Sequence, residues 1–426
     1  MANSRGPSRP TLLLLTSLLA GTTGLGAAGT AATAAPPAPP GCLDTSVEPT
    51  VEQARVDRPA PQAVLRRSRA GERVEAFTGD LCAAGDRAEA RRVVRDHGRD
   101  LWTWATDRAQ GRERVRGNLP GGDDRPLYWA RVSMTRVLAQ WGAAQDEPVA
   151  GLTDRLETTS RGQDTLDVPT ERRATKVVVT GFDPFTLDAD TRIGNPSGAV
   201  ALALDGRTIR TADGPVRIET AMFPVRWDDF AAGEVERTLA PYVQRGPQGL
   251  DALVTVSQGR PDRFDLEVWN GANRGGFADN ENVERTGLVP IPEGYPTVRP
   301  QPQFTLSDLP MDAMAARDTG DYEVVVNHEI TEKDPATGEE RTTTDGPTPG
   351  FLAVAGGPGD YLSNEIAYRA TLLRDGVRSW NVGGHVHTPV LGVPAGDRLT
   401  DEAYEQRRAA MVTQTIRLVR AALEER

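Results

Sequence analysis

The hydrophobic pattern divides the chain into a helical part and a part in which strands alternate with helices. In residues 86–108 and 124–142, apolar side chains recur at the spacing of one helix face. We therefore expect a small, mostly helical module within residues 35–150, whose aromatic side chains pack a core. The run over residues 151–174 is polar, without a helical or strand spacing of apolar residues, and is expected to be a linker.

After residue 174 the pattern changes to short β-branched runs separated by helical stretches. The segment Lys176–Thr180 reads KVVVT, which is typical of a buried parallel strand. Further strands are expected at 219–225, 251–257, 322–327, 351–355 and 380–383, and helices at 196–205, 228–243, 360–374 and 401–424. This alternation predicts an α/β/α sandwich around a mostly parallel sheet over residues 175–426. The polar, Gly- and Pro-rich stretch at 328–350 is expected to be an inserted loop or hairpin.

The N-terminus has the pattern of a targeting segment. Arg5 and Arg9 precede an apolar run that ends near Ala20, and small residues with an Ala-Thr-Ala sequence follow at 32–34. A positive start, a short apolar run and such a cleavage site predict a secretory signal peptide over residues 1–34. A membrane anchor is the alternative, but the run is too short to span a bilayer. The mature chain is therefore expected to be secreted, beginning with a Pro-rich spacer.

Export changes the meaning of the two cysteines, Cys42 and Cys82. Because the outside of a cell is oxidising, we expect them to form a disulfide rather than to stay free thiols. Without accompanying histidines the pair does not make a zinc site. The mature chain is then expected to offer no free thiolate for catalysis.

Composition excludes two classes of partner. The 426 residues include 49 basic and 60 acidic side chains, for a formal net charge of −11. Such a balance argues against a protein that binds nucleic acid, and against a surface that binds anionic membranes. The 43 glycines and 32 prolines indicate long loops and linkers. Beyond the N-terminus, no stretch is long and apolar enough to cross a membrane.

A loop with two phenylalanines follows the first expected strand. Phe182 and Phe185 occur in TGFDPF, and Asn195 begins the later NPS, where it can cap a helix that starts with proline. Ligands of open α/β sheets bind at the carboxyl ends of strands, where such a loop lies. The two rings could wall a small apolar pocket or simply pack a corner, and the residues alone leave both readings open.

A glycine-rich loop and a later histidine pair offer groups for acyl transfer. GGPGDYLSN opens a helix, whose first N–H groups have no partner within the helix. Its Ser363 could attack a carbonyl while those N–H groups hold the oxyanion, or it could be only a helix cap. The histidine at the end of the next strand, His387, could be its base, with a carboxylate to orient it. His-Val-His could also bind a metal, but the sequence offers no third ligand nearby.

Four motifs, in order, resemble pyroglutamyl peptidase I, the pyrrolidone-carboxylate peptidase family of cysteine peptidases. TGFDPF with the later NPS is similar to the N-terminal signature of that family, and VSQGRPDRFDLEVWNGANRGGFADN resembles the segment with its catalytic glutamate. GGPGDYLSNEIAYRATLL resembles the segment with its nucleophile, and HVHTPVLGVP resembles its histidine segment. The resemblance covers residues 176–426 and implies the fold of that family for them.

The resemblance also implies roles for single residues. Phe182 and Phe185 fall where the family holds the lactam ring of its substrate, and we assign Asn195 to the same pocket. Glu267, which taken alone would be an ordinary surface residue, falls on the catalytic carboxylate, and His387 falls on the catalytic histidine.

The nucleophile position departs from the family, because Ser363 stands where the family has cysteine. A serine hydroxyl must lose its proton to the base as it attacks, whereas a thiolate is accessible near neutral pH. Serine would, however, escape the oxidation that threatens an exposed thiolate outside the cell.

The sequence therefore predicts a secreted hydrolase that removes N-terminal pyroglutamyl groups, or cleaves a related small acyl amide, through a Ser-His-Glu site. Such chemistry needs no metal and no cofactor, and its partner is a peptide or small acyl-amide substrate. The alternative is a catalytically inactive homologue that keeps the pocket and acts as a binding protein. The sequence does not predict an oligomeric state.

Overall fold

The structure, a computed structural model, describes residues 41–170, 175–211, 214–244, 246–379 and 381–424. The expected signal peptide and nearly all of the Pro-rich spacer lie outside these residues. Pro40–Arg426 form one compact unit. In the part of the chain that the structure describes, no helix is long and apolar enough to cross a membrane.

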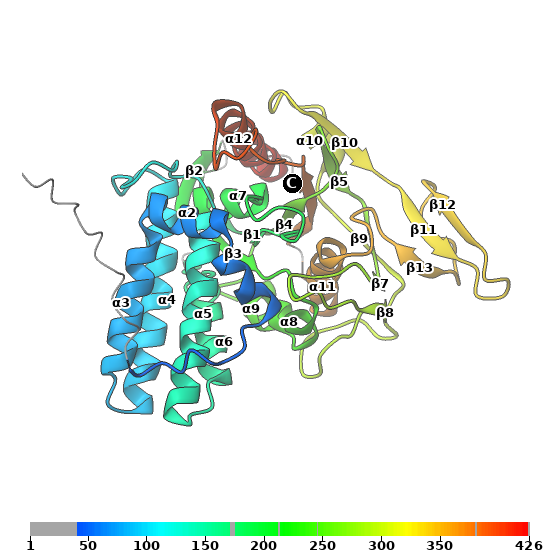
Figure 1. The fold of residues 1–426 in the computed structure, drawn as a ribbon. Coiled ribbons are helices and arrows are strands. Elements are labelled where there is room, and N and C mark those ends of the chain that lie inside the picture. The colour runs from blue at the N-terminus through cyan, green and yellow to red at the C-terminus, as the bar shows by residue number, and fades with distance from the viewer. Residues whose placement is uncertain (1–40, 171–174, 212–213, 245, 380, 425–426) are drawn as a thin grey trace, which may run out of the picture. The chain divides into compact units, whose positions relative to one another are not determined.

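A layer of helices precedes the sheet in the chain (Figure 1), and its apolar side chains form a core that extends to Leu202 and Met222. These helices are α1 (Val51–Ala54), α2 (Pro59–Ser68), α3 (Ala70–Ala83), α4 (Arg87–Ala109), α5 (Arg125–Gln145) and α6 (Ala150–Thr159), with a 3-10 turn at Arg55–Asp57. The helices expected at 86–108 and 124–142 are confirmed as α4 and α5. Phe77, Leu101 and Trp129 are among the fully buried side chains of this core. Cys42 and Cys82 form a disulfide that ties the segment before α1 to α3.

The expectation of a linker over residues 151–174 is wrong for its first half. Residues 150–159 form α6, and Ser160, Arg161 and Gln163 are buried after it. The run is polar because its side chains bind other buried polar groups: Arg161 pairs with Asp183, and Gln163 donates a 2.8 Å hydrogen bond to the carbonyl of Met222. The polar composition of this run predicted exposure to solvent, whereas in the structure its side chains make buried contacts with the sheet.

Seven strands form the central sheet in the order β10-β5-β14-β4-β1-β3-β2. Their bounds are β1 (Thr175–Phe182), β2 (Arg207–Thr211), β3 (Gly214–Phe223), β4 (Ala252–Gln258), β5 (Arg263–Glu267), β10 (Glu323–Asn327) and β14 (Val382–Thr388). Four of the neighbouring pairs are parallel, and β14–β5 and β2–β3 are antiparallel. The mostly parallel α/β sheet expected from the alternating pattern is confirmed.

The two faces of this sheet carry different helices. Val177, Val254 and Val386 belong to the core under α7 (Pro196–Leu204), α10 (Met311–Ala315) and α12 (Glu402–Glu424). Val178 and Leu253 belong to the opposite core, under α8 (Trp227–Ala231), α9 (Glu234–Val243) and α11 (Leu362–Gly376). Because successive strand residues point to opposite faces, β4 and β14 direct their residues 255, 257, 385 and 387 toward the α11 face.

Smaller sheets border the main one. β6 (Trp269–Gly271) pairs with β9 (Phe304–Leu306), β7 (Asn273–Gly275) pairs with β8 (Thr286–Leu288), and β11 (Ile330–Lys333) lies between β12 (Glu340–Thr343) and β13 (Leu352–Ala355). The stretch expected to be an inserted loop or hairpin is an antiparallel hairpin of β11 and β12, and it projects on the side away from α2–α6 (Figure 1). The helix expected over 228–243 is divided into α8 and α9 at Gly233, whose φ of 81° a helix does not allow.

Candidate active site

The loop after β1 carries both phenylalanines of the expected pocket. Phe182 ends β1, and its N–H is bonded to the hydroxyl of Ser197 at 3.1 Å. The ring of Phe182 stacks on Phe230 at 6.1 Å, and the ring of Phe185 lies 6.3 Å from that of Tyr361. Both rings are therefore fixed by other aromatic side chains.

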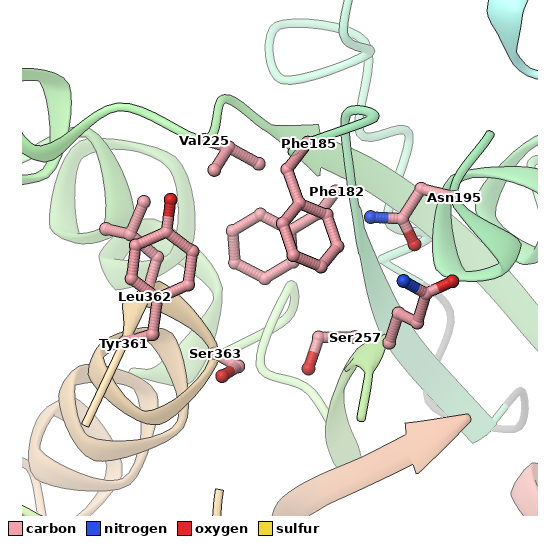
Figure 2. A pocket seen from close by; sticks show the side chains of 9 residues that line it. Phe182, Phe185, Asn195, Val225, Ser257, Tyr361, Leu362 and Ser363 are labelled. Atoms are coloured by element: carbon pink, nitrogen blue, oxygen red, sulfur yellow. The ribbon is translucent and has the colours of Figure 1, made fainter. Parts of the chain in front are cut away.

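These rings line a cavity of about 70 Å³ at the carboxyl ends of β1 and β4. Figure 2 shows its lining, which comprises Phe182, Phe185, Asn195, Val225, Ser257, Gln258, Tyr361, Leu362 and Ser363. We call this cavity the aromatic pocket. The structure thus brings Phe182, Phe185, Asn195 and Ser363 to one cavity.

Asn195 has a mainly structural part in that wall. Its side-chain oxygen accepts from the N–H of Ser197 at 3.0 Å and so caps α7. Its amide nitrogen donates to the carbonyl of Asp183 at 2.9 Å, which ties the phenylalanine loop to the start of the helix.

Glu267 and His387 meet on the α11 face of the sheet, from two antiparallel strands. The imidazole Nδ1 of His387 lies 2.7 Å from Oε1 of Glu267, and the other carboxylate oxygen accepts a 2.7 Å hydrogen bond from the side-chain amide of Asn327. The Glu267 side chain is fully buried and that of His387 nearly so. Within the described residues, Nε2 of His387 has no hydrogen-bond partner.

Gly259 makes room for this histidine. A Cβ on Gly259 would come within 2.5 Å of the His387 ring, so any other residue there would displace the imidazole or the loop after β4. Gly357 approaches the other partner in the same way, since a Cβ there would lie 2.3 Å from Oε2 of Glu267. The pair is therefore enclosed by backbone.

Ser363 lies in the first turn of α11, where the N–H groups have no acceptor within the helix. The residue before the helix, Tyr361, provides no side-chain cap for them. Their partial positive charge suits an oxyanion. The Ser363 hydroxyl itself donates to the carbonyl of Pro358 at 3.1 Å, and not to His387.

A second cavity, of about 310 Å³, shares Ser363 with the aromatic pocket. His387, Arg260, Glu329 and the glycine-rich loop 356–359 are among its lining residues, and Thr331 brings the β11–β12 hairpin to its wall. We call it the hairpin cavity. Ser363 thus stands between a small aromatic space and a larger polar one, and His387 opens on the polar side.

Sequence reasoning left the surroundings of His385 unassigned. Its Nδ1 lies 2.8 Å from the hydroxyl of Thr255, and its Nε2 lies 2.8 Å from that of Ser257. Polar residues at alternate positions of the buried strand ALVTVSQ were the available signal for this contact. The ring of His385 is edge-on to that of His387, with centroids 4.8 Å apart. Among the residues described, no three side chains of histidine, cysteine, aspartate or glutamate gather as metal ligands.

A buried ion pair anchors the phenylalanine loop to the N-terminal helices. Asp183, between the two rings in sequence, binds the guanidinium of Arg131 from α5 and that of Arg161 after α6. All three side chains are buried. The sequence carries no signal for these partners, because Arg131 lies 52 residues and Arg161 lies 22 residues before Asp183.

Comparison with known proteins identifies relatives. Residues 31–157 match the family model of the PA0049 N-terminal domain, and residues 176–311 and 321–392 match that of the PA0049 C-terminal domain. A Pseudomonas aeruginosa protein described as uncharacterized protein PA0049 is 36% identical over 445 residues, covering 80% of each chain. A solved structure, pyroglutamyl peptidase I of Bacillus amyloliquefaciens, aligns at 18% identity with a TM-score of 0.36, covering 59% of this chain and 98% of that chain.

Proposed function

The chain belongs to the PA0049 family, and from its site we propose that it is a secreted hydrolase that removes N-terminal pyroglutamyl groups or cleaves a related small acyl amide. The observation that carries the proposal is the His387–Glu267 contact of 2.7 Å beside a cavity that Ser363 also lines. A carboxylate on Nδ1 leaves Nε2 free to accept a proton, as a general base requires. The four sequence motifs supply the substrate class.

In the proposed reaction the substrate ring enters the aromatic pocket, and the rest of the substrate occupies the hairpin cavity. The hydroxyl oxygen of Ser363 attacks the carbonyl carbon, and its proton passes to Nε2 of His387. N–H groups of the first turn of α11 hold the oxyanion. His387 then gives the proton to the leaving nitrogen, so the C–N bond breaks and an acyl ester on Ser363 remains. Water, deprotonated by His387, hydrolyses that ester and releases the acid.

Glu267 orients His387 and stabilises the imidazolium that forms. Asn327 holds the outer oxygen of the carboxylate, so that the inner oxygen faces Nδ1. This arrangement fixes the proton of the neutral ring on Nδ1 and leaves the lone pair of Nε2 for the serine.

One rearrangement must precede attack. The Ser363 hydroxyl now donates to Pro358, and it must turn to Nε2 of His387 when substrate binds. Catalytic hydrogen bonds are often long or absent before substrate binds and form in the complex.

Secretion belongs to the same proposal. The disulfide between Cys42 and Cys82 fits an oxidising compartment, as does the signal peptide expected over residues 1–34.

The second candidate function is a binding protein without turnover. The contact of the Ser363 hydroxyl with Pro358, in place of a contact with His387, favours it. In that case the aromatic pocket would hold the lactam, and nothing would be cleaved.

The test uses the mature chain with the substitutions Ser363→Ala and Ser363→Cys, and measures release of a fluorescent amine from its pyroglutamyl amide. The proposal expects turnover by the parent and its loss in the alanine variant. Turnover only in the cysteine variant would support the binding protein. A parent and an alanine variant that are equally active would exclude Ser363 as the nucleophile.

A further inference from the structure

The hydrogen bonds around His385 connect a hydroxyl of the aromatic pocket to the sheet. Ser257 lies at the end of β4, lines the aromatic pocket, and places its Oγ 2.8 Å from Nε2 of His385. Nδ1 of the same ring lies 2.8 Å from the Thr255 hydroxyl, which also lies 3.2 Å from the carbonyl of Gly384. The side chains of Thr255, Ser257 and His385 are all buried.

The proton positions follow from the last acceptor. The carbonyl of Gly384 has no proton, so it takes the hydrogen of Thr255. Thr255 then accepts from the Nδ1–H of His385, which leaves Nε2 with a lone pair. Ser257 therefore donates its own hydrogen to Nε2. With that hydrogen engaged, the oxygen of Ser257 offers the pocket lone pairs only.

His385 is unsuited to take the Ser257 proton as a catalytic base. Burial, and then the nearby His387, hold the pKa of His385 well below its usual range, so the ring stays neutral. The hydrogen-bond partners of its ring are hydroxyls, and among the described residues no carboxylate bonds to it to stabilise an imidazolium. By contrast His387 has Glu267 at 2.7 Å. The function that fits His385 is to fix the orientation of Ser257.

The other side-chain oxygens of the aromatic pocket are engaged as acceptors or face elsewhere. That of Asn195 caps α7, and that of Gln258 accepts from the N–H of Leu391 at 3.0 Å. The Tyr361 hydroxyl donates to the carbonyl of Ala278 at 3.1 Å. Ser363 is reserved for the reacting carbonyl in the proposed reaction. Ser257 is thus the side-chain acceptor of this wall that is oriented and still has lone pairs for a ligand.

We infer that Ser257 is a specificity-determining residue, which accepts a hydrogen bond from the ring N–H of a cyclic amide held between the aromatic side chains. This inference rests on the proposed function, since it concerns the acyl side of the same substrate. It assigns Ser257 to recognition of a lactam, as opposed to a hydrocarbon or ketone ring of the same size. A buried acceptor left unpaired by the wrong ring is a strong means of discrimination.

The experiment compares two matched ligands, the pyroglutamyl amide and its 3-oxocyclopentanecarboxyl amide, in which CH₂ replaces the ring N–H. Each is tested with the parent, Ser257→Ala and Ser133→Ala. The control Ser133 is a comparably buried serine, which donates to the Trp129 carbonyl in α5 and does not line the pocket. Turnover gives kcat/KM, and binding of the uncleaved amides is measured by calorimetry in the parent, if it is inactive, and otherwise in the Ser363→Ala background.

We expect Ser257→Ala to weaken binding of the pyroglutamyl amide about tenfold. The same variant should change the affinity for the ketone analogue less than about twofold. Ser133→Ala should leave the preference unchanged. If the parent binds but cleaves neither ligand, the proposed function fails, and the same tenfold change in Kd still supports the role of Ser257.

Three results would overturn the inference. The first is an unchanged preference, or an equal loss for both ligands, in Ser257→Ala. The second is a loss of turnover as complete as in Ser363→Ala with the Kd unchanged, which would make Ser257 the nucleophile. The third is a parent that binds neither amide, which would remove the lactam pocket and the proposed function together.

Discussion

His387 and Glu267 form a direct contact of 2.7 Å between Nδ1 and Oε1, and Asn327 binds the outer oxygen of the same carboxylate. Two strands of opposite direction, β14 and β5, bring the residues together. The orientation of the carboxylate is therefore set from outside the pair. It follows that even an isosteric change at residue 267 has a defined chemical consequence.

We predict that Glu267→Gln lowers kcat about 1,000-fold with little change in KM. The amide oxygen of glutamine will face the Asn327 N–H, so its NH₂ will face Nδ1 of His387. That contact moves the ring proton to Nε2, where it blocks acceptance of the Ser363 proton. Kinetics on the pyroglutamyl amide measure the effect.

Glu332→Gln is the matched control for that change. Glu332 is also a fully buried carboxylate, but it lies on β11 and binds Thr348 and Arg341. The Glu332→Gln variant should be less stable than the parent and keep the parental kcat. A Glu267→Gln enzyme with parental kcat would contradict the assigned role of Glu267.

Regular hydrophobic patterns predicted most of the sheet and its helices. The runs at 176–180 and 251–257 became β1 and β4, and the stretches at 360–374 and 401–424 became α11 and α12. These elements have apolar periods that a single sequence displays. The strand β5 was missed, although it carries Glu267, because Arg263 and Asp265 make it look exposed. The structure buries Asp265 and pairs it with Arg263 at 2.9 Å.

Contacts between distant segments could not be predicted from the hydrophobic pattern. The motifs supplied His387 and Ser363, but not the contact of Ser257 with His385, which lies 128 residues away. Likewise the charged residues after α6 suggested a solvated linker, since charge in a sequence does not show its partner. Their burial against Asp183 depends on the arrangement of the whole unit.

That burial predicts a large cost for Arg131→Met. The side chains of Arg131 and Asp183 are both fully buried, and removal of one partner leaves the other without full compensation. We expect a loss of about 3 kcal/mol in the free energy of unfolding, measured by urea denaturation. Because Asp183 lies between Phe182 and Phe185, affinity for the pyroglutamyl amide should fall as well.

Arg99→Met provides the comparison. Arg99 pairs with Asp164 at 2.7 Å, but its side chain is 45% exposed, so its loss should cost under about 1 kcal/mol. Equal losses in the two variants would mean that the buried pair contributes no more than a surface pair. Helices α5 and α6 would then not be needed to support the phenylalanine loop.

The disulfide predicts a difference between oxidised and reduced protein. Cys42 and Cys82 are 40 residues apart in sequence, and closing such a loop restricts the unfolded chain. Reduction, or substitution of both cysteines by alanine, should lower the free energy of unfolding by about 3–4 kcal/mol. The double variant should then be insensitive to reductant. A parent whose urea midpoint is the same with and without reductant would contradict this prediction.

Asp124 predicts a pH dependence of stability. Its side chain is buried in front of α5, one oxygen accepts the Asn195 N–H at 2.8 Å, and the other has no partner among the described residues. Burial, and then the adjacent Asp123, raise the pKa of Asp124 to about 7, above the ordinary value of 3.8. Between these pH values the folded chain keeps a proton that the unfolded chain releases, so stability falls as the pH rises from about 4 to 7.

Asp124→Asn keeps the acceptor for Asn195 and has no proton to lose. We therefore expect the variant to be more stable than the parent at pH 8 by about 4 kcal/mol, and to match it near pH 4, in urea titrations at pH 4, 6 and 8. Asp154→Asn, at an exposed position of α6, controls for the change in net charge. A difference between Asp124→Asn and the parent that is the same at all three pH values would show that Asp124 does not hold a proton in the folded protein.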